Sequence, residues 1–315
     1  MAGKLLNLVA VLFGATLLVT GFLRMVPGNP VDHILGDQAP EEARVQLAKD
    51  LGFVDENNQP IGFVKQYGQF IYKLSTNQLV SYRTREPVLT TLASHLPYTL
   101  ALALAAMLFA LSIGPLLGLL AAYKKGSAID FLASFIALLG ICVPRFFLGP
   151  LLLLLFSIRY PIFPISGASD GFMSLILPAF SLGMAMAAIQ TRLTRASVLE
   201  VLSEDYIQTA KAKGLSNFRV YFKHALGNAL IPLITVVGLE LGSLLTGAVV
   251  TEKIFNWPGI GLLLLESIQT LDMPMVQTIV LVIAFIYVVT NLFTDLVYQW
   301  VDPRIRSSNR LGESP

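Results

Sequence analysis

The chain has 315 residues, of which 55% are hydrophobic and 13% are charged. The charged share is about half that of an average soluble domain, and the apolar residues fall in long runs, which excludes a disordered protein or a small disulfide-stapled one. The net charge of +2 and the scattered basic residues argue against nucleic acid as a partner. The single cysteine, Cys142, lies in an apolar run and is expected to be a small buried hydrophobe rather than a reactive thiol.

Six apolar runs approach or exceed the length of about 20 residues that a helix needs to cross a bilayer. They are Leu5 to Leu23, Pro97 to Ala122, Phe131 to Ile158, Met173 to Ile189, Ala229 to Thr251 and Val276 to Trp300. The first run has only Lys4 before it and no small-x-small cleavage site near its end, so we interpret it as an uncleaved anchor.

Basic residues in the short loops indicate the orientation, because they gather on the cytoplasmic side. The outer short loops hold only Arg159 and Lys253. The inner segments hold Lys4, Lys124, Lys125, Arg192, Arg195, Lys211, Lys213, Arg219, Lys223, Arg304, Arg306 and Arg310. Both termini are therefore expected in the cytoplasm.

The segment between the first two runs is long enough to fold on the outer face. Residues 41–52 begin with two acids and end at Gly52, which is typical of a short capped helix. Apolar residues recur at helical spacing at Ile61, Val64, Ile71 and Leu74, and again from Leu89 to Leu96. We expect a small helical cap that leads into the second span at a bend near Pro97.

Enzyme motifs are missing or misplaced. The three histidines, His33, His95 and His224, form no His-Glu-x-x-His pattern, and no phosphate-binding loop occurs, so we predict no catalytic residue, no metal site and no ATP site in this chain. The run from Gly167 to Gly171 spells Gly-x-Ser-x-Gly, but it lies in a proline-rich outer loop with no strand before it. We interpret it as a turn.

The cytoplasmic loop 191–228 is the most informative segment. It is expected to form two short helices about Gly214, where a positive φ suits the end of the first helix. The apolar face of the first begins with Val198, Val201 and Leu202, and Phe218, Tyr221 and Phe222 form a stripe on the second. Periodicity alone is compatible with two interpretations of this loop. It could be a hairpin that lies on lipid headgroups, or a surface that docks another protein.

The residues of this loop resemble the Glu-Ala-Ala loop of permease subunits in binding-protein-dependent ATP-binding-cassette importers, in the variant of the oligopeptide and dipeptide permeases. Gln208, Thr209 and Ala210 stand at the Glu-Ala-Ala positions and Gly214 at its glycine. His224 opens the later Ile-x-Leu part, and Gly227 replaces the final proline of the general pattern.

The resemblance extends over most of the chain. Pro27 to Pro30 follows the first span as in that family, and residues 252–261 resemble its Glu-x-Ile-Phe-x-x-Pro-Gly-x-Gly segment. Asn291, Asp295 and the closing 302–306 also fit. One departure lies at 76–82, where the family often has a Gly-Asp-Leu-Gly-like turn before Ser-Tyr.

The resemblance implies an all-α polytopic membrane protein with six transmembrane helices in a bacterial inner membrane. It implies an anchor span at 1–26, an extracytoplasmic helical cap at 27–96, a permease domain at 97–302 with the coupling loop 191–228, and a cytoplasmic tail at 303–315. Its partners would be a second permease subunit, two ATPases that carry the ATP-Mg, and an extracytoplasmic binding protein. Substrates in the family include dipeptides, longer peptides, glutathione and nickel.

The resemblance also implies roles for particular residues. A coupling helix would seat in a groove on an ATPase, with Gly214 turning the chain out of that groove. The residues expected at this contact are Glu204, Tyr206, Gln208, Thr209, Ala210, Lys211, Lys213, Gly214 and His224. At the outer end, Trp257, Pro258, Gly259 and Gly261 would form either a plain turn or a re-entrant piece of the gate.

Two charges, Arg145 and Glu240, are expected near mid-membrane, where isolated charge is costly. They could form an ion pair, line the substrate pathway, or be solvated separately. Gly238 and Gly242 are expected to permit close helix packing, and Asn291 and Asp295 to form hydrogen bonds.

Two other functional classes must be weighed. An ion-coupled secondary transporter would use Glu240 and Arg145 but would not explain the patterned loop. An intramembrane hydrolase would need a histidine partner for Ser169, and none is expected nearby.

Overall fold

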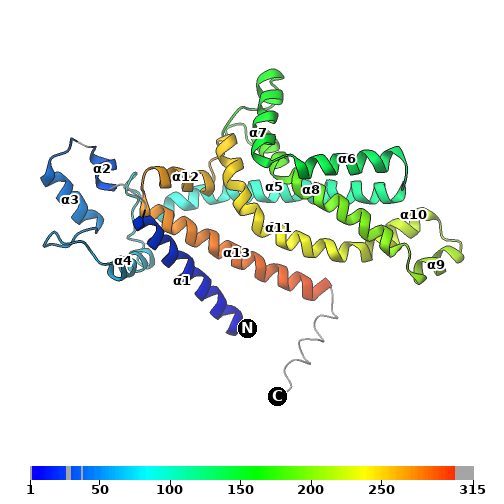
Figure 1. Ribbon diagram of the computed structural model, residues 1–315, viewed down its shortest axis with the longest axis horizontal. Helices are drawn as coiled ribbons and strands as arrows, with labels where there is room; N and C mark the ends of the chain where they lie inside the picture. The colour runs from blue at the N-terminus through cyan, green and yellow to red at the C-terminus, as the bar shows by residue number, and fades with distance from the viewer. Residues whose placement is uncertain (1, 26–29, 37, 302–315) are drawn as a thin grey trace, which may run out of the picture. The chain divides into compact units, whose positions relative to one another are not determined.

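The computed structural model describes residues 2–25, 30–36 and 38–301 of the chain (Figure 1). Within them the regular elements are helices, and β-structure is limited to two isolated bridges, Val54 to Pro60 and Val80 to Pro87. The elements are α1(Ala2–Met25), α2(Pro30–Leu35), α3(Glu41–Leu51), α4(Phe63–Ser75), α5(Val88–Tyr123), α6(Ala128–Cys142), α7(Arg145–Leu153), η1(Leu154–Arg159), α8(Phe172–Val201), α9(Asp205–Ala212), α10(Asn217–Arg219), η2(Val220–Ala225), α11(Leu226–Phe255), α12(Ile260–Gln269) and α13(Met273–Val301). The prediction of an all-α membrane protein is confirmed.

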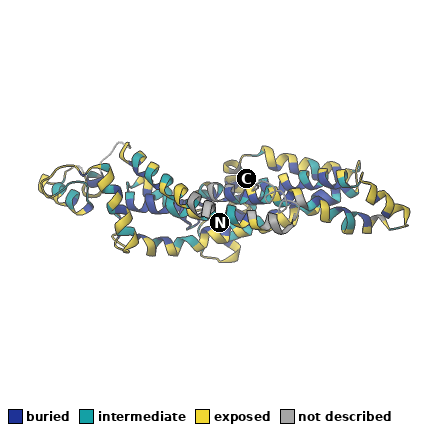
Figure 2. Cartoon of the chain, turned by 90° about the horizontal axis from the view of Figure 1, so that it is seen from below, coloured by how far each residue is buried: buried dark blue, intermediate teal, exposed yellow. Residues whose placement is uncertain are grey.

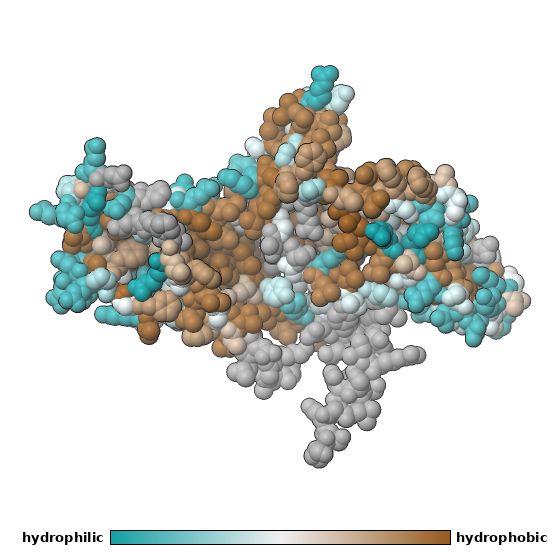
Figure 3. All heavy atoms as spheres, viewed as in Figure 1, coloured by the Kyte–Doolittle hydropathy of each residue, from teal (hydrophilic) through white to brown (hydrophobic). Residues whose placement is uncertain are grey.

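Four of these helices, α1, α5, α8 and α13, are single elements long and apolar enough to cross a membrane. Three bent helix pairs could each form one more span, so the described chain has four to seven candidates. The number six lies in this range and stays a prediction. Hydrophobic side chains cover the outward faces of the long helices, whereas hydrophilic ones gather over α2 to α4 and over α9 and α10 (Figure 3).

The third apolar run, Phe131 to Ile158, is not one continuous helix. It is divided into α6 and α7 at Pro144, before which Val143 is extended, with φ −77° and ψ 118°. Proline disfavours the helical conformation in the residue before it and cannot donate a backbone hydrogen bond, so the break follows from Pro144 itself. Cys142 lies at this break and is exposed, contrary to the expectation that it is buried.

Two other boundaries differ from the expected ones. The helix of the fourth span does not stop at Ile189 but continues in α8 to Val201, so Val198 and Val201, expected in the first helix of loop 191–228, belong to α8 instead. The second span begins nine residues before Pro97, at Val88, and α5 is assigned continuously through the proline. A helix can accommodate proline inside a membrane protein when neighbouring groups satisfy the freed carbonyl.

Residues 1–98 and 258–288 form one compact unit, which contains the cap. The expected helices at 41–52 and around 61–74 are confirmed as α3 and α4, and Gly52 caps α3 with φ 79°. The buried face of α4 was not the expected one, because Val64 is 82% exposed whereas Tyr67 and Phe70 are buried. The hydroxyls of Tyr67 and Thr16 are 2.7 Å apart, which ties α4 to α1.

Residues 99–257 and 289–315 form the second unit. Its largest apolar cluster draws on α5, α8 and α11 and contains Leu102, Ala106, Ala110, Leu182, Met186, Leu244 and Trp257. Buried residues follow the packed faces of the helices and exposed ones the outer faces (Figure 2). Small residues bring these helices close: a Cβ at Gly183 would lie 2.5 Å from the Ala106 carbonyl oxygen, and one at Gly238 would overlap the Thr294 side chain. Close packing at Gly238 is therefore confirmed.

We predict that Gly183→Ala destabilises the protein by about 1–3 kcal/mol, because the added methyl meets backbone of α5 that cannot move aside. Gly68→Ala in α4 is the matched control, since a Cβ there has nothing within 4 Å, and this change should be neutral or slightly stabilising. Thermal unfolding in detergent, followed by the loss of monodisperse protein, measures both. Equal melting temperatures for the two variants would contradict the packing argument.

Candidate functional site

The candidate site is the surface helix α9 with the chain on either side of it. Glu204 is extended, with ψ 147°, and α9 begins at Asp205, an acid in the first turn that favours the positive end of the helix dipole. Lys211 lies in the last turn, and Gly214 follows with φ 78°. The expected helix between Glu204 and Lys213 and the expected positive φ at Gly214 are thus confirmed.

One side of α9 is fixed to the body of the second unit by Ile207 and Ala210, the two buried residues of this helix. Ile207 has no exposed surface and belongs to a cluster that joins α9 to the ends of α5 and α8 and to the start of α11. The buried members of this cluster are Leu119, Ala122, Val198, Ile207, Val220, Ala225 and Ala229. The apolar residues of the loop are therefore used largely inside the protein.

The other side of α9 is open. Glu204, Gln208, Thr209, Lys211, Lys213 and Gly214 are all exposed. Tyr206 is 42% exposed, and its hydroxyl accepts a hydrogen bond from Asn228 Nδ2 at 2.7 Å and lies 3.5 Å from the His224 carbonyl oxygen. Tyr206 is therefore held at one end by α11 and η2, while part of its ring remains available to another molecule.

The second expected helix of the loop, α10 with η2, runs directly into the start of α11, and the chain then bends by 49° between Leu230 and Pro232. The expected aromatic stripe is divided between inside and outside. The Tyr221 ring packs edge-on against Tyr123 of α5 at 5.1 Å, whereas Phe218 is 60% exposed and stacks on Phe222 at 4.3 Å. This arrangement leaves one aromatic ring at the surface beside α9.

Two buried carboxylates lie deeper in the same unit. Glu240 of α11 accepts a hydrogen bond from Gln190 Nε2 of α8 at 3.1 Å. Glu252, near the end of α11, is completely buried and accepts one from Thr99 Oγ1 of α5 at 2.6 Å. From the sequence, Glu252 was identified only as part of the family motif. A carboxylate next to a run of apolar residues does indicate a buried polar contact, and this signal was missed.

The Arg145 side chain lies outside the part of the chain that the structure describes, as do the side chain of Asp295 and residues 26–29 and 302–315. The predicted pair between Arg145 and Glu240 is therefore not tested by these contacts. One partner of Glu240 in the described chain is the neutral amide of Gln190.

The turn after α11 contains the residues that were predicted for a gate. Asn256 ends α11 with φ 49°, and the Trp257 amide donates to the Glu252 carbonyl oxygen at 2.8 Å. Trp257 is buried in the core of the second unit, whereas Pro258 and Gly259 precede α12 of the first, in which Gly261 is buried. The Gly-x-Ser-x-Gly run is a turn, as expected, and the Gly167 amide donates to the Phe255 carbonyl oxygen at 3.0 Å.

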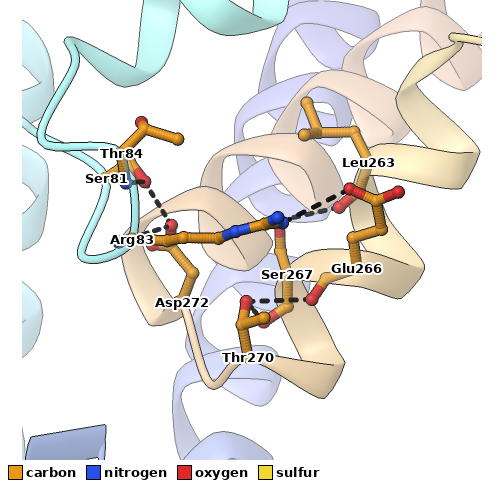
Figure 4. A network of polar contacts seen from close by, with 8 residues as sticks. All are labelled: Ser81, Arg83, Thr84, Leu263, Glu266, Ser267, Thr270 and Asp272. Atoms are coloured by element: carbon orange, nitrogen blue, oxygen red, sulfur yellow. Dashed lines mark hydrogen bonds and ion pairs between the residues drawn. The ribbon is translucent and has the colours of Figure 1, made fainter. Parts of the chain in front are cut away.

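A polar network not foreseen from the sequence fixes the cap within the first unit. The buried carboxylate of Asp272, between α12 and α13, accepts hydrogen bonds from the Ser81 hydroxyl and from the Tyr82 amide at 3.1 Å. Arg83 forms an ion pair with Glu266 of α12 at 3.4 Å (Figure 4). These contacts lie in and next to segment 76–82, the one that departs from the family pattern.

The Tyr82 side chain, next to this network, is itself largely buried. Burial, together with the negative charge of Asp272, raises the pKa of the Tyr82 hydroxyl above its ordinary value. The hydroxyl therefore stays protonated and donates to the Leu51 carbonyl oxygen at 3.2 Å.

The sequence profile of the family described as binding-protein-dependent transport system inner membrane component matches residues 114–307. The chain is 41% identical to the dipeptide transport system permease protein DppB of Alkalihalophilus pseudofirmus, over 96% of this chain and 98% of the relative. It is 40% identical to the di/tripeptide transport system permease protein DppB of Pseudomonas aeruginosa, over 97% and 98%. Identity to the glutathione transport system permease protein GsiC of Escherichia coli K12 is 39%, over 96% and 97%.

Among solved structures, a chain of the MetNI methionine ABC transporter in an inward-facing conformation has the same fold. The TM-score is 0.58 and the identity 17%, and the alignment covers 69% of this chain and 99% of that one. Together, the profile match and the nearly full-length relatives show that this chain belongs to the family of binding-protein-dependent transport system inner membrane components.

Proposed function

We propose that the chain is the membrane-spanning permease subunit of an ATP-binding-cassette importer that moves dipeptides and other short peptides into the cytoplasm. The observation that carries this proposal is the nearly full-length identity of about 40% to permeases named for dipeptides and for di- and tripeptides. A relative named for glutathione, which is itself a tripeptide, is almost as similar, so a glutathione-like substrate is the second candidate. Nickel is a further alternative from the family resemblance.

The open side of α9 supports its role as the contact with an ATPase subunit. A helix lying on lipid headgroups needs an apolar face directed at the membrane. Here the apolar residues Val198, Ile207 and Val220 are completely buried within the protein, and the exposed side of α9 is polar. This distribution favours a protein-docking surface over the lipid-bound hairpin. A docking surface also explains why the loop is patterned, which a secondary transporter would not explain.

The expected assembly follows from this role. Two ATPase subunits would hold ATP-Mg and contact the α9 side, while a second permease subunit, different from this one, would complete the pathway. A soluble binding protein would deliver peptide on the outer side. The chain would need no cofactor of its own, and it would act in transport, with no catalytic residue.

Gly214→Val should abolish peptide uptake while the protein still folds, because valine strains the positive φ that directs the chain out of the ATPase contact. Gly126→Val is the matched control: this turn glycine also has φ 78° and nothing within 4 Å of a Cβ. Uptake of a labelled dipeptide into cells, with membrane levels measured in parallel, compares the two. Normal uptake with Gly214→Val would contradict the role of Gly214 in coupling. Equal loss of uptake in both variants would mean that backbone strain, rather than lost coupling, explains the effect.

We propose that both termini face the cytoplasm of a bacterial inner membrane, since the inner segments carry most of the basic residues. Green fluorescent protein fused at the C-terminus should fluoresce, and alkaline phosphatase fused there should be inactive. A phosphatase fused within the cap, after Asn57, should be active. The opposite pattern would reverse the proposed topology.

Arg145 and Glu240 are proposed to form an ion pair near mid-membrane. Arg145→Gln and Glu240→Gln should each lower the melting temperature more than the double variant does, because removing one partner leaves an uncompensated charge worth about 3 kcal/mol or more. Additive losses in the double variant would indicate independent positions. In that case the hydrogen bond from Gln190 would still be available to Glu240.

The substrate is tested by purifying the chain in mild detergent from its native membrane and identifying the accompanying proteins by mass spectrometry. Two ATPases, a second permease and a binding protein that releases a short peptide on denaturation are expected. The folded chain recovered alone would favour the secondary transporter. A binding protein that carries nickel or glutathione would support the importer function but contradict the proposed peptide substrate.

A further inference from the structure

A hollow with two arginines opens on the surface of the second unit, between α6 and α8. Its lining residues are Ser134, Leu138, Arg192, Arg195 and Ala196. The two helices pack closely through small side chains, since Ala133 and Ala137 are buried and a Cβ at Gly140 would lie 2.8 Å from the Ala188 Cβ. The longer side chains of Leu138, Arg192 and Arg195 therefore lie at the edge of this contact, around the hollow.

Arg195 is held in a fixed orientation within the hollow. Its Nε and one terminal nitrogen donate to the two carboxylate oxygens of Asp130, at 2.6 and 2.9 Å. The Gly126 amide holds the same carboxylate at 2.9 Å. Because a guanidinium carries five N–H groups, this bidentate pair leaves donors that can reach a second acceptor.

Arg192 lies one turn before Arg195 on the same helix and is exposed. Within the part of the chain that the structure describes, no carboxylate lies within ion-pair distance of it. Two arginines and one aspartate leave a net charge of +1 at the hollow. The site therefore matches a ligand with a single negative charge.

Apolar side chains lie in the hollow and beside it on α6, which distinguishes it from a site for a soluble anion. Leu138 lines it and is 48% exposed, and Phe131 and Phe135 stack on the same helix with ring centroids 6.2 Å apart, Phe131 being 74% exposed. Ligand groups next to the charged part would thus contact hydrocarbon.

The position along α6 agrees with the depth of a lipid headgroup. Asp130 lies in the first turn of α6, soon after Lys124 and Lys125, and Ser134 and Leu138 lie one and two turns further. At 1.5 Å per residue the hollow covers about 6 to 12 Å along the helix. The headgroup layer is about 5 to 8 Å thick on each side of a bilayer, so the hollow extends from this layer into the first part of the acyl chains.

We propose that this hollow binds the phosphate of an anionic phospholipid, with Arg192 and Arg195 as its ligands and the acyl chains lying against Leu138 and Phe135. Guanidinium groups match phosphate oxygens bidentately, and basic pockets between membrane helices are suited to anionic headgroups. The site lies at the end of α8 that leads into α9, so the bound lipid would brace the helix that carries the coupling loop.

The test is native mass spectrometry of the full chain, purified with its accompanying subunits, stripped of lipid and then titrated with phosphatidylglycerol or with phosphatidylcholine of the same acyl chains. Wild type should retain phosphatidylglycerol about tenfold more strongly, as expected for charge-assisted hydrogen bonds. Arg192→Gln should remove this preference. Arg159→Gln, which removes an exposed arginine that does not line this hollow, should keep it.

Ser134→Leu gives a second variant that fills the hollow and keeps both arginines, and it should also lose the preference. Equal retention of the two lipids by wild type, or equal behaviour of Arg192→Gln and Arg159→Gln, would overturn the proposal. Displacement of phosphatidylglycerol by millimolar inorganic phosphate would assign the site to a soluble anion instead.

Discussion

The structure depends on one constraint: inside a bilayer, every backbone N–H and C=O must find its partner within the protein. Helices meet this demand internally, which explains why long apolar runs become α1, α5, α8 and α13. Where the helix is interrupted, as at Pro144, the exposed backbone needs neighbours, and α7 packs against both α8 and α11 there. Cys142 and Pro144 at the break itself are exposed, so it is α7 beyond the break that these helices hold.

Close packing then determines which polar groups can be buried. Lipid chains give apolar helices little reason to associate, so the helices meet through small residues such as Gly183 and Gly238. The resulting contacts enclose Glu252 and Glu240, and each receives a hydrogen bond from a side chain of a different helix, Thr99 or Gln190. These bonds fix the relative register of α5, α8 and α11 more sharply than apolar contact alone would.

The sequence predicted what rests on periodicity and local chemistry. The end of α3 at Gly52, the end of α9 before Gly214 and the positive φ of Gly214 follow from nearby residues alone, whereas the start of α9 does not, because Val198 and Val201 of the expected helix belong to α8. It failed where tertiary contacts decide: the apolar spacing of α4 indicated Val64, whereas Tyr67 is buried because Thr16 and Phe13 of α1 receive it. The carboxylate of Asp272 meets Ser81 across 191 residues, and no local pattern signals such a contact.

The attachment of α9 has a mechanical consequence. If this helix were joined to the protein only through flexible chain, a movement imposed on it would be absorbed by the loop. Ile207, however, is completely buried among residues of α5, α8 and α11, and the Tyr206 hydroxyl bonds Asn228 at the start of α11. A displacement of α9 must therefore either open this cluster, at a cost of about 2 kcal/mol for one isoleucine-sized side chain, or carry the helix ends with it. The second course is the one that could transmit force from a partner bound to the polar side of α9 into the membrane.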